Sequence, residues 1–130
     1  MHKTMMLSLF AITLALTACG GGGGSEITPI YGAIAVNSTR ADAGIATGFP
    51  SQNDADFRAI QDCGNTQACT IVKRFNEARQ CAVLAFSVNG SGGIVAYGVE
   101  ANKSAAETSA LRNCVSQGGN YCELWKYACQ

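Results

Sequence analysis

The second half of this sequence repeats the first, and this internal duplication constrains the fold more than any other feature. A shift of about fifty residues aligns YGAIAV at 31–36 with CAVLAF at 81–86, AIQDC at 59–63 with ALRNC at 110–114, and CTI at 69–71 with CEL at 122–124. The dipeptide Gly44-Ile45 aligns in the same way with Gly93-Ile94. Because these patterns keep their order, each half is expected to form the same supersecondary unit.

Each half is predicted to run strand, strand, helix, strand. Strands are predicted at 31–37, 44–49 and 69–75 in the first half and at 82–88, 93–100 and 122–129 in the second, where NGSG at 89–92 signals a hairpin. Helices are predicted at 54–63 and 105–116, with capping boxes at Asn53 with Asp56 and at Ser104 with Glu107. The expected fold is an α+β domain: an antiparallel sheet from two tandem ββαβ halves, with two helices on one face.

The cysteines predict three disulfides. Six of the seven lie in the repeated region, and an even number in a small exported domain is typical of a disulfide framework. Two pairs are expected as repeat equivalents that join a helix end to the next strand, and the third follows by subtraction: Cys63 with Cys69, Cys114 with Cys122, and Cys81 with Cys129. The rival interpretation is a metal site. The sequence has no CxxC pair and its one histidine is His2, so no metal and no cofactor are expected.

The N-terminus predicts an exported protein with a lipid anchor. A short positive region precedes an apolar run at 5–16 that is too short to span a bilayer but suits a signal peptide. The following LTAC resembles a bacterial lipobox, in which Cys19 receives the lipid. An ordinary secretory signal with an incidental cysteine is the alternative.

Three regions follow from this interpretation. They are a lipoprotein signal peptide at 1–18, a lipidated flexible tether at 19–30, and a disulfide-bonded tandem-repeat domain at 31–130. Glycine follows Cys19. Resemblance to the Gram-negative sorting rule then implies that the lipid anchor lies in the outer membrane and that the domain faces the periplasm. The expected localisation is therefore the cell envelope, with the lipid anchor in the membrane.

The order of the repeated segments resembles a bacterial family named only domain of unknown function 4189. The resemblance runs from Tyr31 to Cys129 and rests on YGAIAV, GIATGF, ADFRAIQDCG, CAVLAF, AETSALRNC and CELWKYAC. Tyr31 stands where many members have tryptophan. The family carries no established activity. Some members are similar to small envelope proteins encoded beside secreted antibacterial toxins, and this resemblance implies an immunity role.

The residue inventory argues against most catalytic classes and against nucleic acid as a partner. Without its signal peptide the chain keeps eight basic residues (nine less Lys3) and nine acidic ones, and a net charge near −1 does not suit nucleic-acid binding. The loss of His2 removes the histidine that Ser-His-Asp and Cys-His sites need. The carboxylates Asp54, Asp56, Glu100 and Glu107 leave a small carboxylate-only hydrolase as an alternative. The chain is not expected to be an enzyme.

Strand alternation predicts a protein-binding surface. Cys122 must face the helix to reach Cys114, so residues of the opposite parity face away from both helices. Tryptophan, tyrosine and arginine are common interface anchors, and the residues expected on this face are Trp125, Tyr127, Arg74 and Val72. The alternative is that Trp125 and Tyr127 are core residues.

The function expected from these features is non-catalytic protein binding in the envelope, as an immunity protein or inhibitor against a secreted antibacterial toxin or lytic enzyme. A structural or accessory envelope lipoprotein is the second class, and the carboxylate-only hydrolase is the third. The expected partners are a protein and, through the lipid anchor, the membrane. The identity of the partner and the oligomeric state stay open at this point.

Overall fold

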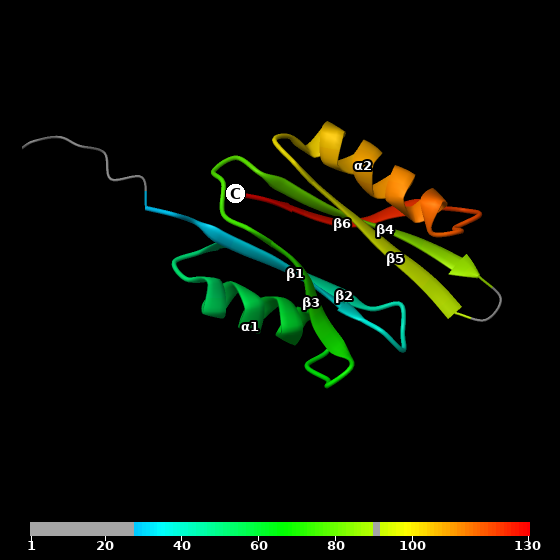
Figure 1. The fold of residues 1–130 in the computed structure, drawn as a ribbon, viewed down its shortest axis with the longest axis horizontal. Helices are drawn as coiled ribbons and strands as arrows, with labels where there is room; N and C mark the ends of the chain where they lie inside the picture. Colours follow the sequence, from blue (N-terminus) through cyan, green and yellow to red (C-terminus); the bar gives the residue numbers. More distant parts are fainter. Residues whose placement is uncertain (1–27, 90–91) are drawn as a thin grey trace, which may run out of the picture.

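The computed structural model describes residues 28–89 and 92–130 (Figure 1). The elements in chain order are β1 (Tyr31–Asn37), β2 (Ala43–Phe49), α1 (Gln52–Asp62), β3 (Cys69–Phe75), β4 (Cys81–Asn89), β5 (Gly92–Glu100), α2 (Lys103–Ser116) and β6 (Glu123–Cys129). The predicted signal peptide, Cys19 and the tether up to residue 27 lie outside the described residues. Within the described ranges, no helix has the length and apolar character that crossing a membrane requires.

The strands form two antiparallel three-stranded sheets, one from each half of the chain. The first sheet has the order β2-β1-β3 and the second has the order β5-β4-β6, so the two halves share one topology. The predicted α+β class and the duplicated ββαβ unit are confirmed. The strands do not join into one sheet, because β1 and β4 each pair on both sides with strands of their own half.

The two sheets pack face to face, with α1 outside the first sheet and α2 outside the second (Figure 1). Ile34, Phe75 and Leu84 are buried between the sheets, together with partly buried apolar side chains of β2 and β5. The helices therefore cover opposite outer faces instead of one face of a shared sheet. The physical reason is that β1 and β4 carry apolar residues at both parities, so each sheet buries both of its faces.

Small residues bring each helix close to its sheet. The buried core under α1 consists of alanines and cysteines, and that under α2 adds only Val83. A Cβ on Gly44 would overlap the backbone carbonyl of Ala59 in α1, and a Cβ on Gly98 would overlap that of Ala106 in α2. Glycine at these two positions therefore sets the distance between helix and sheet.

The pairing registers correct one part of the repeat alignment. Ala35 pairs with Gly44, and its counterpart Ala85 pairs with Ala96. Gly44 is therefore equivalent to Ala96 and not to Gly93, because the second hairpin is longer than the first.

Both helices begin two residues earlier than predicted. Ser51 is the N-cap of α1: its Oγ accepts a hydrogen bond from the backbone N–H of Asp54 at 3.1 Å and donates to the Asp54 carboxylate at 2.6 Å. Asn102 is the N-cap of α2, and its Oδ1 accepts from the backbone N–H of Ala105 at 2.9 Å. These side chains satisfy N–H groups that a helix start leaves without partners. The predicted caps are wrong, because both lie inside the first turn: Asn53 in α1 and Ser104 in α2.

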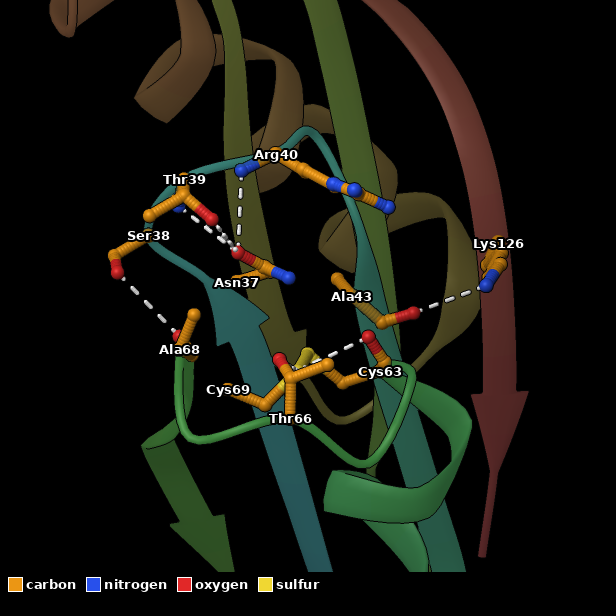
Figure 2. The surroundings of a disulfide bond; sticks show 10 residues. All are labelled: Asn37, Ser38, Thr39, Arg40, Ala43, Cys63, Thr66, Ala68, Cys69 and Lys126. Carbon is orange, nitrogen blue, oxygen red and sulfur yellow. Dashed lines mark hydrogen bonds between the residues drawn. A yellow bond between two sulfur atoms is a disulfide. The ribbon is translucent and has the colours of Figure 1, made fainter.

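The three predicted disulfides are confirmed: Cys63–Cys69, Cys114–Cys122 and Cys81–Cys129. The first two are repeat equivalents, each with 6.1 Å between its Cα atoms, and each ties the end of a helix to the next strand. Figure 2 shows the first of them beside the loop between β1 and β2. The third links directly opposed residues of β4 and β6, with 4.0 Å between the Cα atoms.

A β-bulge in β3 and another in β6 change the direction of the side chains that follow. The pairing of β3 with β1 skips Val72, and the pairing of β6 with β4 skips Trp125. One extra residue shifts the alternation, so later side chains face the opposite way. Phe75 accordingly lies between the sheets. Lys126 points toward the other sheet, where its Nζ donates to the carbonyl of Ala43 in β2 at 2.9 Å (Figure 2).

Candidate functional site

The outer strand β6 exposes three large apolar side chains. Leu124 is 45% exposed, Trp125 is 38% exposed and Tyr127 is 59% exposed. The interpretation of Trp125 and Tyr127 as core residues is therefore wrong. Large apolar side chains that are exposed together are unfavourable in water and typically mark a contact surface.

These side chains border a shallow hollow of about 180 Å³ between β6 and the first turns of α2. Lys103 and Glu107 come from α2, where they form an ion pair with 3.6 Å between Nζ and Oε1. The Lys103 Nζ also lies 3.8 Å from the centroid of the Tyr127 ring. The full lining is Val83, Lys103, Glu107, Leu124, Trp125, Lys126 and Tyr127. The hollow thus combines apolar side chains with the Lys103–Glu107 ion pair. The ammonium of Lys126 lies on the opposite face of β6, where it is bound to Ala43.

Trp125 is held in place from two sides. Its ring centroid lies 5.9 Å from that of Phe86, at an interplanar angle of 49°. The Nζ of Lys126 lies 4.2 Å from the Trp125 centroid, within range of a cation–π interaction. Because Lys126 is also bound to the other sheet, the indole is oriented by both halves of the molecule.

The same place in the first half is filled by a closed polar network. By the repeat, Gln52, Asp56 and Arg74 correspond to Lys103, Glu107 and Tyr127. The Arg74 guanidinium donates to both oxygens of the Asp56 carboxylate, from Nε to Oδ1 at 3.2 Å and from Nη2 to Oδ2 at 2.8 Å. Gln52 Nε2 donates to the same carboxylate at 2.8 Å. A bidentate contact of this kind is among the stronger hydrogen-bonded pairs.

The network sets the charge state of Asp56. Desolvation by burial acts to raise the pKa of its carboxyl, but the hydrogen bonds from Arg74 and Gln52 and the charge of Arg74 outweigh it, so the pKa is lowered. The pKa of Arg74 is raised, first by the hydrogen bond to Asp56 and then by its charge. Asp56 and Arg74 therefore form a stable ion pair at neutral pH.

The predicted single binding face does not exist. Arg74 faces α1 and Tyr127 faces α2, on opposite outer sides of the molecule. Val72 lies on the first sheet, where its carbonyl accepts a hydrogen bond from the Tyr97 hydroxyl at 3.2 Å. Of the four predicted residues, the structure brings together Trp125 and Tyr127. The prediction was wrong because the bulges invert the parity and because the sheets cover each other's inner faces.

Sequence reasoning missed the charged residues of the hollow. Lys103 and Glu107 are four residues apart on a helix, a spacing that predicts an ion pair on one helix face. Regular alternation from Cys122 would place Lys126 under the helix, where a lysine is unfavourable, and this misfit is a signal of the bulge.

Three of the four carboxylates considered for hydrolysis have other contacts. Asp54 caps α1 with Ser51, Asp56 is bound by Arg74, and Glu107 is paired with Lys103. In the described parts of the chain, no three histidine, cysteine, aspartate or glutamate side chains are grouped as metal ligands.

Comparison with known proteins gives one match. Residues 31–129 match the model of a family described as "Domain of unknown function (DUF4189)". No curated protein and no solved structure matches the chain significantly.

Proposed function

The chain belongs to the DUF4189 family, and we propose that it is an envelope lipoprotein whose domain binds another protein without catalysing a reaction. The observation that carries the proposal is the exposure of Leu124, Trp125 and Tyr127 together on β6. A partner that covers these side chains would remove their apolar surface from water. Tryptophan and tyrosine are also the residues most often found as anchors of protein interfaces.

The proposal also includes a lipid anchor at Cys19 and a class of protein partner. The LTAC motif supports lipidation at Cys19, which would hold the domain at the membrane of the cell envelope. The specific form that we propose is an immunity protein or inhibitor against a secreted antibacterial toxin or lytic enzyme. The support for this form is the sequence resemblance to small envelope proteins that are encoded beside such toxins.

The test is affinity capture with the full chain in detergent, from periplasmic extract and culture fluid. Trp125→Ala and Tyr127→Ala should each lose the captured partner, because truncation of an interface anchor typically weakens binding by about 2 kcal/mol or more. Both variants should fold, because both side chains are exposed on β6. Thermal melts close to that of the wild type would establish this.

Tyr121→Ala is the matched control. Tyr121 precedes β6 and is 84% exposed, but it does not line the hollow. It should retain the partner. A partner that binds all three variants equally would show that the binding surface lies elsewhere. For the immunity form, the captured protein should be a toxin or lytic enzyme whose activity the domain inhibits.

A further inference from the structure

We propose that the disulfide between Cys81 and Cys129 is a redox-sensitive link between β4 and β6, which a thiol reductant opens by attack on the sulfur of Cys129. Opening of the link frees the end of β6 that carries Tyr127 and weakens binding at the hollow. Two observations carry the inference: the exposure of Cys129, and the different ways in which the two halves hold their outer strands. The selective opening stands by itself, and its effect on binding rests on the proposed protein-binding function.

Cys129 is the exposed member of this disulfide. It lies at the end of the outer strand β6, whereas Cys81 is 6% exposed and packs in the core under α2. In thiol–disulfide exchange a thiolate attacks one sulfur of the bond, so access to that sulfur controls the rate. A reductant in solution therefore meets the bond at Cys129.

The other two disulfides are covered. The carbonyl oxygen of Cys63 lies 3.0 Å from the Sγ of Cys69, and the Thr66 hydroxyl lies 3.6 Å from the same sulfur (Figure 2). In the second half, a Cβ on Gly119 would overlap both sulfurs of Cys114–Cys122, so the backbone of this glycine lies directly against them. These two disulfides should therefore react slowly while the chain is folded.

The two halves hold their outer strands in different ways. In the first half, the Arg74 guanidinium binds the Asp56 carboxylate and ties β3 to α1. The equivalent of Arg74 in β6 is Tyr127, which cannot form an ion pair. The equivalent of Cys81 in β1 is Tyr31, so the covalent link belongs to the second half alone. The disulfide thus supplies in the second half the attachment that the ion pair supplies in the first.

Opening of the disulfide loosens the end of β6. This strand is the outer one of its sheet, and all of its residues are exposed or partly exposed. The end is also held by Gln130, whose backbone N–H donates to the carbonyl of Gln80 and whose Nε2 donates to that of Glu77, each at 2.9 Å. Competition from water makes the net contribution of each such hydrogen bond small. Tyr127 lies two residues before Cys129, so it should move more freely after reduction.

The chemical step is a two-electron exchange with a dithiol of the kind that protein reductases carry. One thiolate of the dithiol attacks the Sγ of Cys129 and forms a mixed disulfide. The electron pair of the broken bond leaves on the Sγ of Cys81, which takes up a proton. The second thiolate of the reductant then attacks the mixed disulfide, so the reductant becomes a disulfide and Cys129 leaves as a thiolate that is protonated in turn.

The first experiment treats the full chain in detergent with dithiothreitol, stops the reaction at intervals with iodoacetamide and maps the alkylated peptides. Cys81 and Cys129 should be alkylated at least about tenfold faster than the other four paired cysteines, because access controls the rate. In concentrated urea, where no sulfur is covered, the three disulfides should open at similar rates. With glutathione in place of dithiothreitol, the mixed disulfide should lie on Cys129 and the alkyl group on Cys81.

Hydrogen exchange and partner capture then test the consequence for β6. After selective reduction, the amides at 126–129 should exchange faster, while those of β3 should exchange as before. The reduced chain should also capture less of the partner than the oxidised chain. The double variant Cys81→Ala with Cys129→Ala is the matched control: it should bind like the reduced wild type, and dithiothreitol should not weaken it further. A thermal melt accompanies it, and the selectively reduced wild type decides the question if the variant unfolds.

Four results would overturn the inference. They are equal rates of opening for the three disulfides of the folded chain, a mixed disulfide on Cys81, unchanged exchange in β6 after selective reduction, and equal capture by the oxidised and the reduced chain. If a partner is captured through Trp125 and Tyr127 and any of these results is found, this inference alone fails. If selective opening loosens β6 and neither redox form captures a protein, the redox-sensitive link stands and the proposed function fails.

Discussion

At the scale of single residues, Asp56 of α1 and Arg74 of β3 form a polar contact that links the helix to the strand. The contact is bidentate and is supported by Gln52 on the same helix. Its counterpart in the second half, Lys103 with Glu107 and Tyr127, is looser, and the Glu107 carboxylate is more exposed than that of Asp56. Arg74 and Tyr127 occupy the same position of the repeat. In the first half this position links the strand to the helix, and in the second half it borders the candidate site.

The lowered pKa of Asp56 makes part of the stability depend on pH. Because the folded chain binds this proton less readily than the unfolded chain, the contribution is complete above the ordinary aspartate pKa of about 3.9. It is lost as the pH falls through the lowered pKa of the folded state. In Asp56→Asn, stability should therefore decrease less on acidification than in the wild type, as measured by urea unfolding across the acid range.

Asp62→Asn is the control for this pH dependence. Asp62 lies on the same helix in an exposed pair with Arg58, at 3.3 Å, and exposed pairs contribute little to stability. Its acid profile should follow that of the wild type. An Asp56→Asn profile that also follows the wild type would contradict a role for the Arg74 contact in stability.

At the scale of the elements, the disulfides differ in the length of chain that they close. Cys81–Cys129 spans 48 residues and ties the first strand of the second half to the last, whereas Cys63–Cys69 spans 6. In the chain-entropy model the stabilisation grows with the logarithm of the loop length. Replacement of the Cys81–Cys129 pair by alanine should therefore cost about 2 kcal/mol more than replacement of the Cys63–Cys69 pair.

Denaturant unfolding of the two double variants measures this difference, and non-reducing peptide mapping of the wild type checks the pairing first. A peptide that links Cys63 or Cys69 to the second half of the chain would contradict the pairing. An equal loss of stability in both variants would contradict the loop-length explanation and favour local strain or packing instead.

At the scale of the whole molecule, Cys19→Ala should release the protein from membranes. The acyl chains attached to Cys19 would supply the membrane affinity, at about 0.8 kcal/mol for each buried methylene group, while the domain begins only at β1. Membrane fractionation with fatty-acid labelling measures the release, and Ser25→Ala in the same tether is the control. Unchanged membrane retention together with an unlabelled wild type would refute lipidation at this cysteine.

The sequence by itself determined the elements and the disulfides. Apolar periodicity and turn residues are local signals, and the duplication provided each of them twice. The strands and helices accordingly lie within two residues of the predicted ranges. The pairing of Cys63 with Cys69 followed from its equivalence to Cys114 with Cys122, and the remaining pair followed by counting.

The sequence also indicates part of the packing. β1 and β4 carry apolar residues at both parities, with Ile34 and Leu84 at one and Ala35 and Ala85 at the other. A strand of this kind is typically buried on both faces. The pattern thus indicated that the face turned away from each helix is covered, as the contact between the two sheets confirms.

Only the tertiary structure decided the composition of the candidate site. The alternation rule holds for a regular ladder, and the bulges at Val72 and Trp125 break it without a glycine or another local signal. A one-residue shift moved Tyr127 to the α2 side, next to Lys103, and turned Lys126 toward β2. Which strand residue is left unpaired depends on the packing of whole sheets and helices, and no short stretch of sequence contains that information.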